Sequence, residues 1–381
     1  MKRPLPIEVF PPGDFIREEL DARGWTQDVL AEVLGRPARL VSEIITGKRA
    51  ITPETAQGLG EAFGTGAQVW MNLEAAYRLS QVRGEGNLVA RRARLYSKAP
   101  VKEMIRRHWI EHSASVDVLE RRVLDFLGID SLDEEPTPIP HAARKSTSYS
   151  AVPPAQCAWL IRASRLARAV SAVPFTETRF ERGLSRLREL LHSPEEVRQV
   201  PRVLADAGVR FVVVEHLSQT RIDGAALWLD GKSPVVALSL RFDRMDYFWH
   251  TLLHDLMHIR NGDVGPASNP LVDSDIEVAR SLASSERPPF ELIADKDAAE
   301  FLVPQAELDG FVARTRPLYA KVKIAGFAHR LGIHPGIIVG QLQHRGEIPF
   351  AHSREMLVKV RSIVTSAALT DGWGCYAPAG L

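Results

Sequence analysis

The sequence has few cysteines and no long apolar run. Its 381 residues include two cysteines, Cys157 and Cys375, which lie far apart and in no metal-type spacing, so we expect reduced thiols and no disulfide framework. No stretch approaches the roughly 18 uncharged apolar residues of a membrane-spanning helix, and the N-terminus lacks the apolar core of an export signal. These absences predict a cytoplasmic protein with no membrane partner.

Net charge is also nearly absent, because the formal charge at neutral pH is +1. This excludes a chain that is basic throughout, but the charge is spread unevenly. From Arg78 to Glu111, nine Lys or Arg residues stand against three Glu residues. That local excess suits contacts with phosphate, and it equally suits the solvated face of a helix. With 45% hydrophobic and 25% charged residues, the chain has the composition of a globular protein of two or three domains.

The first sixty-odd residues predict a series of short helices. The predicted helices are Asp14–Arg23, Gln27–Leu34, Pro37–Thr46 and Thr55–Phe63. Thr26 can cap the second helix, Gly35 breaks it, and Pro37 suits the first position of the third. A helix, a tight turn and a further helix form a helix-turn-helix, in which the later helix lies in the major groove of DNA. Lys48 and Arg49 follow the end of that helix, where basic side chains can contact phosphate.

Three stretches within Pro12–Leu79 form a distinctive pattern: TQDVLAEVLG, SEIITGKRAITPETA and VWMNLEAAYRL. Through them the segment resembles the HigA branch of the XRE-type, phage-repressor-like DNA-binding fold. This resemblance implies a five-helix domain that forms a homodimer on an inverted-repeat operator in double-stranded DNA, represses its own promoter and counteracts a cognate toxin. It also implies DNA-contacting residues: Gln27 at phosphate or a base edge, Arg36, Arg39 and Ser42 at the groove, and Lys48 and Arg49 at phosphate.

One departure from the HigA pattern lies at the start of the recognition helix. Relatives often carry Ser-Arg where this sequence has Pro37-Ala38, which removes polar reach and leaves Arg39 as the expected base reader. The alternative is a small helical domain that serves only for dimerisation.

The middle of the chain predicts packing helices rather than chemistry. Helical periodicity covers Asn87–Phe126, and further helices are expected at Ala155–Val170, Phe180–Leu191 and Glu195–Ala207. Asp130–Pro154 is rich in Pro, Ser, Thr and charge and reads as a connector. The basic helices can extend a DNA footprint or grip a partner protein.

A small sheet is predicted ahead of the most distinctive helix. Val209–Glu215 reads as a buried strand, and Asp230-Gly231 is a hairpin signal between strands at Gly224–Leu229 and Pro234–Leu240. The helix that follows, Phe242–Ile259, has no Gly or Pro.

Two histidines of this helix have the spacing of metal ligands. His254 and His258 stand four apart and so project from one helical face. Asp255 holds the place that the zinc-peptidase pattern H-E-x-x-H gives to a general base. In a second helical stretch, Glu291 and Asp295 also stand four apart, so one carboxylate can bind zinc while the other holds a ligand imidazole.

Three motifs follow one another in the region Gly208–Phe350: HTLLHDLMHI, FELIADKDAAEFLVP and IAGFAHRLGIHPGIIVGQL. With these motifs in this order, the region resembles the ImmA/IrrE family of metallopeptidases. This resemblance implies a zinc ion held by His254, His258 and Glu291, with Asp255 as general base and Asp295 behind the ligands. It implies site-specific cleavage of a repressor protein of the XRE class. His334, in the third motif, is expected near the site without an assigned role.

Two residues depart from the metallopeptidase pattern. Asp255 is one methylene shorter than Glu, so its carboxylate is drawn back by about 1.5 Å, and such a displacement can cost about a hundredfold in rate. His250 extends the histidines to a ladder of three, but eight residues of helix span about 12 Å, so stacking on Trp249 or exposure to solvent is favoured over ligation.

The whole chain is therefore expected to be mainly α with a small α+β part. The expected divisions are a five-helix helix-turn-helix domain at 1–80, a helical connector region at 81–207, a zincin-like domain with a small β-sheet at 208–350 and a tail at 351–381. The function expected first is a HigA-type regulator whose zinc peptidase domain cleaves a repressor or toxin-linked partner. The alternatives are a non-catalytic regulator that uses the peptidase fold as a sensor or interaction platform, and a solitary regulator without a toxin.

Overall fold

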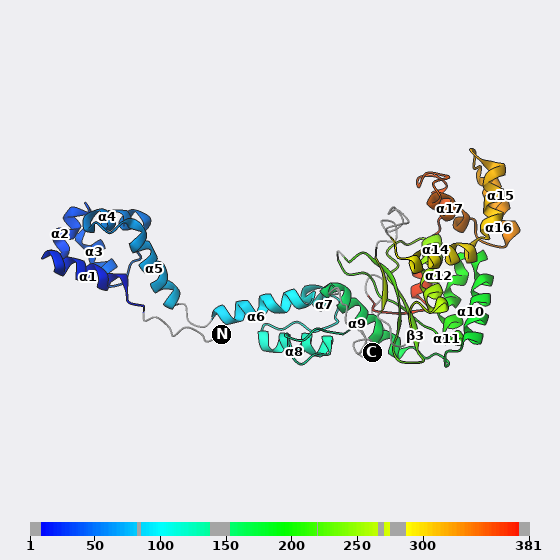
Figure 1. The fold of residues 1–381 in the computed structure, drawn as a ribbon, viewed down its shortest axis with the longest axis horizontal. Coiled ribbons are helices and arrows are strands. Elements are labelled where there is room, and N and C mark those ends of the chain that lie inside the picture. Colours follow the sequence, from blue (N-terminus) through cyan, green and yellow to red (C-terminus); the bar gives the residue numbers. More distant parts are fainter. Residues whose placement is uncertain are drawn as a thin grey trace. The chain divides into compact units, whose positions relative to one another are not determined.

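The computed structural model describes residues 9–81, 85–137, 153–218, 220–265, 270–274 and 287–372. The chain divides into two compact units, Met1–Arg92 and Ala93–Leu381 (Figure 1). Both are rich in helix, and the second contains a small mixed sheet, so the predicted fold class is confirmed. None of the helices in these described ranges is long and apolar enough to cross a membrane.

The first unit contains the five helices that the resemblance implied. They are α1 (Pro12–Arg23), α2 (Gln27–Val33), α3 (Ala38–Ile45), α4 (Pro53–Phe63) and α5 (Ala67–Gln81). Their apolar faces meet in one core, to which each of the five helices contributes a buried side chain, among them Ile16, Leu30, Val41, Leu59 and Trp70. The amphipathic pattern of each helix therefore explains why this unit closes on itself.

Local capping fixes where these helices begin. The Thr26 hydroxyl accepts a hydrogen bond from the Val29 amide at 3.3 Å, as predicted, and Thr52 caps α4 in the same way. The prediction that Pro37 is the first residue of the third helix was wrong by one position. Pro37 has an extended ψ of 138° and acts as the N-cap, since its carbonyl accepts from the Leu40 amide at 2.9 Å.

The second unit carries most of the helices. Before the sheet come α6 (Glu85–Lys98), which begins in the first unit, α7 (Val101–Arg106), α8 (Val116–Leu127), α9 (Pro154–Ala169), α10 (Glu177–Glu189) and α11 (Val200–Ala207). After the first three strands come α12 (Met245–Asn261), α14 (Pro289–Leu302), α15 (Gln305–Thr315), α16 (Lys321–Leu331), α17 (Pro335–His344) and α18 (Arg361–Thr365). Short 3-10 turns lie at Leu190–His192, Pro194–Gln199 and Arg354–Met356. Most of the predicted connector, at 138–152, lies outside the described residues.

The sheet has five strands in the order β4-β2-β3-β1-β5. They are β1 (Arg210–Val213), β2 (Ile222–Trp228), β3 (Pro234–Leu238), β4 (Leu271–Ser274) and β5 (Leu369–Thr370). β2 and β3 are antiparallel, so the predicted hairpin is confirmed, and Asp230 closes its turn by accepting from the Lys232 amide at 2.8 Å. β1 pairs in parallel with both β3 and β5. The predicted tail thus contributes an edge strand.

Both faces of the sheet are covered by helices. Phe211 and Val213 point into a core with α10, α11 and α12, whereas Val212 and Val214 point into a second core with α7, α8 and α9. This alternation follows from the two-residue period of a strand, and burial on both sides explains why the last three residues of β1, Phe211–Val213, are apolar. The middle helices, which the sequence placed in a separate connector region, therefore share their cores with the sheet.

Candidate functional site

The two candidate metal ligands of α12, His254 and His258, lie on one face of this buried helix. α12 begins after Arg244 and ends at Asn261, and the φ of 76° at the following Gly262 suits a glycine C-cap. His254 is 2% exposed and His258 is fully buried. Their Nε2 atoms lie 2.9 Å apart, and the ring planes are nearly perpendicular at 84°. The i, i+4 spacing therefore aims both imidazoles at one point, as predicted.

Glu291, at the start of α14, completes the group. Its carboxylate oxygens lie 3.2 Å from His254 Nε2 and 3.7 Å from His258 Nε2. One ligand atom from each of the three residues falls within a mutual distance of 4.8 Å. Two imidazoles and a carboxylate form a donor set that suits zinc, so these residues fit the metal that the sequence implies.

Carboxylates hold the other nitrogen of each imidazole. Asp295 Oδ1 lies 2.9 Å from His254 Nδ1, and Asp263 Oδ2 lies 2.9 Å from His258 Nδ1. Arg287 in turn contacts Asp295 Oδ2 at 2.7 Å. Such partners orient a histidine and raise its basicity toward a metal. The sequence identified Asp295 but missed Asp263 and Arg287, although Asp263 follows the glycine that ends the helix.

The electrostatics of Glu291 reflect this convergence. Burial alone would raise the pKa of its carboxyl, but hydrogen bonds with His254 and His258 and their positive charge lower that pKa to about 2. The carboxylate is thus ionised at neutral pH, which is the form that binds a cation.

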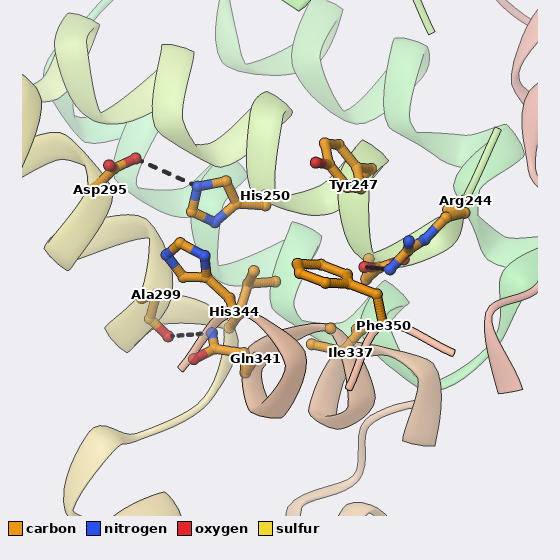
Figure 2. A pocket seen from close by; sticks show the side chains of 12 residues that line it. Arg244, Tyr247, His250, Asp295, Ala299, Ile337, Gln341, His344 and Phe350 are labelled. Atoms are coloured by element: carbon orange, nitrogen blue, oxygen red, sulfur yellow. Dashed lines mark hydrogen bonds and ion pairs between the residues drawn. The ribbon is translucent and has the colours of Figure 1, made fainter. Parts of the chain in front are cut away.

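His250 lies closer to this group than the sequence suggested. We expected it to stack on Trp249 or to face solvent, but its Nε2 lies 3.3 Å from Asp295 Oδ1 and its side chain is 14% exposed (Figure 2). His250, His254 and Asp295 form a second set of possible ligand atoms within 4.8 Å. Asp295 therefore stands between two histidines of α12.

Asp255 lies on a different side of α12. The residue is fully buried, and a Cβ built on Gly224 of β2 would come within 2.4 Å of Asp255 Oδ2. The carboxylate therefore packs against the backbone of the sheet, where only glycine leaves it room. The role of Asp255 as general base remains a prediction.

His334 has a structural role. It is the N-cap of α17, and its Nδ1 accepts a hydrogen bond from the Gly336 amide at 3.1 Å. Burial lowers the pKa of His334, which keeps the ring in the neutral form that can accept.

The residues predicted to touch DNA lie around α3. Five of these six residues are exposed: Gln27, Arg36, Arg39, Lys48 and Arg49. The sixth, Ser42, is partly exposed. Gly35, with a φ of 59°, permits the turn before α3. This face presents cations together with hydroxyl and amide groups.

Glu43 of α3 organises two of these cations, which the sequence did not anticipate. Its carboxylate lies 2.8 Å from Arg39 Nε and 3.5 Å from an Arg49 nitrogen. The hydrogen bond with Arg39 lowers the pKa of Glu43. Arg39 nevertheless remains 88% exposed at its side chain and can exchange this partner for another.

Comparisons with known proteins concern the first unit. The helix-turn-helix family model matches residues 16–70. The HTH-type transcriptional regulator YddM of Escherichia coli K12 is 36% identical over 70 residues, which are 18% of this chain and 74% of that protein. Virulence-associated protein I of Dichelobacter nodosus is 39% identical over 69 residues, or 18% of this chain and 64% of that protein.

Two solved structures match the same share of the chain. An addiction module antidote protein of the HigA family from Coxiella burnetii is 31% identical, with 22% of this chain and 94% of that chain covered and a TM-score of 0.21. PA4674 from Pseudomonas aeruginosa, solved with its operator DNA, is 33% identical, with 20% and 84% covered and a TM-score of 0.20. Each of these four matches covers about a fifth of the chain.

Proposed function

The chain belongs to the helix-turn-helix family through residues 16–70, and from this premise we propose that it is a DNA-binding transcriptional regulator of the HigA antitoxin type. We further propose that its second unit is an ImmA/IrrE-like zinc metallopeptidase domain that cleaves a repressor or toxin-linked partner protein. Double-stranded operator DNA and a second copy of the chain are its other proposed partners.

The exposed cations around α3 support the DNA-binding part. Arg39 lies on the outer face of α3, where it can reach a base edge, and Lys48 and Arg49 follow the helix, where they can reach phosphate. Glu43 pre-positions Arg39 without covering it, so little ordering is needed on binding.

The DNA-binding part is tested by footprinting on the DNA upstream of the chain's own gene. The full-length protein is expected to protect an inverted repeat there, and Arg39→Ala is expected to abolish the protection. Arg121→Ala is the matched control, because Arg121 on α8 is 78% exposed and also pairs with an acidic residue four positions on. Absence of protection at every salt concentration would overturn this part of the proposal.

The observation that carries the metallopeptidase part is the convergence of His254, His258 and Glu291 within 4.8 Å. These three would hold the ion, while Asp295 and Asp263 fix the imidazole rings through their second nitrogens. A zinc ion held there would supply Lewis-acid polarisation of a peptide carbonyl and a lowered pKa of water. Asp255 would accept the proton of the attacking water.

The position of Asp255 favours a second candidate function. A general base must reach the water it deprotonates, but Asp255 is fully buried and lies against Gly224. This favours a non-catalytic regulator in which the metal-binding fold senses a signal or docks a partner.

Metal analysis combined with a cleavage assay separates the two candidates. The full-length protein is expected to hold one zinc ion, His258→Ala none, and Asp255→Ala one. Proteins encoded by the neighbouring genes are then incubated with the wild type and with each variant. Cleavage by the wild type that Asp255→Ala abolishes supports the peptidase, whereas stoichiometric zinc without cleavage supports the non-catalytic regulator. Absence of zinc from the wild type overturns both the zinc peptidase and the metal-binding regulator.

A further inference from the structure

A pocket of about 120 Å³ is lined by side chains of α12, α14 and α17 and by Phe350. Figure 2 shows the Phe350 ring among the side chains that line it. His250 and Asp295 line the pocket and also belong to the ligand-type cluster with His254. Asp295 lies 2.9 Å from Nδ1 of His254, a proposed metal ligand. One side chain of the pocket lining therefore contacts the proposed metal centre.

Most of the surface that lines this pocket is apolar, while His250, Gln341 and His344 also line it. Tyr247 of α12, Leu302 of α14 and Ile337 of α17 contribute apolar surface together with Phe350. The main charges around them are balanced within the protein. Arg244 makes two hydrogen bonds with Asp246, at 3.0 and 2.7 Å, and Asp295 pairs with Arg287 at 2.7 Å. A charged group entering the pocket would therefore lose water without gaining a free partner.

The size of the pocket suits a single side chain. A protein cavity of about 150 Å³ lined by apolar residues can hold one benzene ring, so about 120 Å³ suits one ring or one branched aliphatic group. It is too small for a nucleotide or a folded partner. Phe350 is 58% exposed, so the mouth of the pocket opens to solvent beside an aromatic ring.

We propose that this pocket binds a large apolar side chain, aromatic or branched aliphatic, of the polypeptide presented at the metal centre. The pocket then determines which residue of a partner protein lies next to the ion. This inference rests on the proposed metal centre, and it holds for a cleaved substrate and for a bound partner alike.

Hydroxamate probes test the pocket without requiring cleavage. Phenylalanine hydroxamate and glycine hydroxamate share a zinc-binding group and differ in the side chain. Their binding to zinc-loaded full-length protein is measured by titration calorimetry. We expect the phenylalanine compound to bind at least about tenfold more tightly, which corresponds to about 1.4 kcal/mol. Glycine hydroxamate reports the metal alone.

Two variants locate the preference in the pocket. Ala299→Phe places a ring inside it and is expected to remove the tenfold preference while leaving glycine hydroxamate binding unchanged. Phe350→Ala removes an exposed wall, so folding is not at risk, and should reduce the preference about threefold. Ala313→Phe, at an exposed position of α15, is the matched control and should change neither affinity.

The two possible failures are distinguishable. Equal binding of the two hydroxamates to the wild type, or a preference that survives both Ala299→Phe and Phe350→Ala, overturns the pocket assignment and leaves the metal centre standing. Failure of glycine hydroxamate to bind the zinc-loaded protein, or failure of zinc to bind at all, overturns the metal centre and the pocket assignment with it.

Discussion

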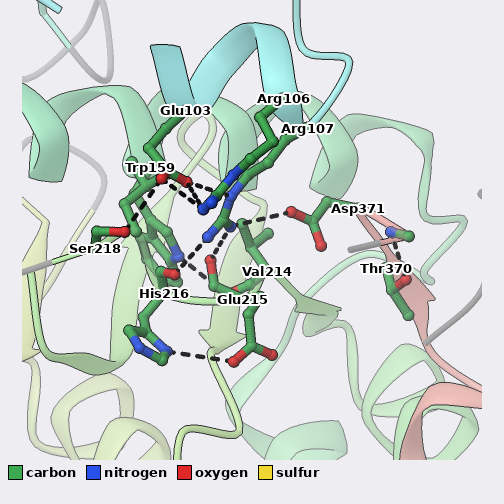
Figure 3. Close-up of polar contacts among 12 residues, drawn as sticks. Glu103, Arg106, Arg107, Trp159, Val214, Glu215, His216, Ser218, Thr370 and Asp371 are labelled. Carbon is green, nitrogen blue, oxygen red and sulfur yellow. Dashed lines mark hydrogen bonds and ion pairs between the residues drawn. The ribbon is translucent and has the colours of Figure 1, made fainter. Parts of the chain in front are cut away.

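Arg107, just after α7, and Asp371, just after β5, form a buried ion pair with an Nη1–Oδ2 distance of 3.7 Å (Figure 3). Their side chains are 3% and 2% exposed. The same guanidinium donates at 2.7 Å to the backbone carbonyls of Glu215 and His216, which follow β1. Burial lowers the pKa of Arg107, and the carboxylates of Asp371 and Glu103 oppose that shift. One side chain thus connects the end of α7, the end of β1 and the end of the edge strand β5.

This arrangement predicts a large loss of stability in Arg107→Ala. The substitution removes the positive charge that pairs with the buried Asp371 carboxylate and the donors that bind two backbone carbonyls. We therefore expect a loss of about 3–5 kcal/mol in the free energy of unfolding. Denaturant unfolding followed by tryptophan fluorescence measures this. Arg121→Ala, which removes an exposed pair on α8, should cost less than about 1 kcal/mol. A cost below about 1 kcal/mol for Arg107→Ala would show that the pair does not join these elements.

The elements that the sequence predicted are those with strong local signals. The hairpin at Asp230 and the long helix α12 follow from turn chemistry and apolar periodicity, and both are present. The edge strands β4 and β5 were not predicted, because they have four and two residues and depend on distant partners. β5 pairs with β1 more than 150 residues earlier in the chain, which no local pattern encodes.

The metal-type residues were predictable for a similar reason. The spacing of four residues places His254 and His258 on one face of α12, and it places Glu291 and Asp295 on one face of α14. The packing of α12 against α14 then brings the two pairs together. Asp263 and Arg287 lie outside those helices, so only the tertiary structure shows them beside the imidazole ring and Asp295. The orientation of Asp255 toward Gly224 likewise depends on how α12 packs on the sheet.

Asp295→Asn is predicted to weaken zinc binding. An amide cannot support the His254 imidazole as a carboxylate does, and loss of such a partner typically costs about 10–100-fold in metal affinity. Competition between the protein and a chromogenic chelator measures this affinity. Asp309→Asn, at an exposed carboxylate of α15, is the control and should bind zinc as the wild type does. Unchanged zinc affinity in Asp295→Asn would remove Asp295 from the metal centre.

Lys48→Ala is predicted to change the salt dependence of DNA binding. If Lys48 neutralises one phosphate, its loss should lower the slope of log affinity against log salt concentration by about 1, and it should weaken all sequences alike. Arg39→Ala should instead weaken the operator more than unrelated DNA, because Arg39 is the proposed base reader. Fluorescence anisotropy at several salt concentrations separates the two effects. Identical behaviour of both variants would contradict these separate roles.

The His334 cap predicts a pH dependence of stability. Its pKa in the folded protein is below the ordinary value of 6.5, because burial disfavours the charged ring more than Glu195 favours it. The unfolded chain therefore binds more protons, so the stability from this residue is present above about pH 6.5 and declines as pH falls toward the folded pKa.

His334→Asn separates the cap from its titration. Asparagine can accept from the Gly336 amide at any of these pH values, so the variant should lose less stability than the wild type between pH 7.5 and 5 (about 2.5 pH units around the ordinary histidine pKa). His334→Ala removes the cap and should cost about 1 kcal/mol at pH 7.5, above that ordinary pKa. Denaturant unfolding at each pH provides the comparison. Parallel pH profiles for the wild type and His334→Asn would mean that the neutral ring is not what holds the start of α17.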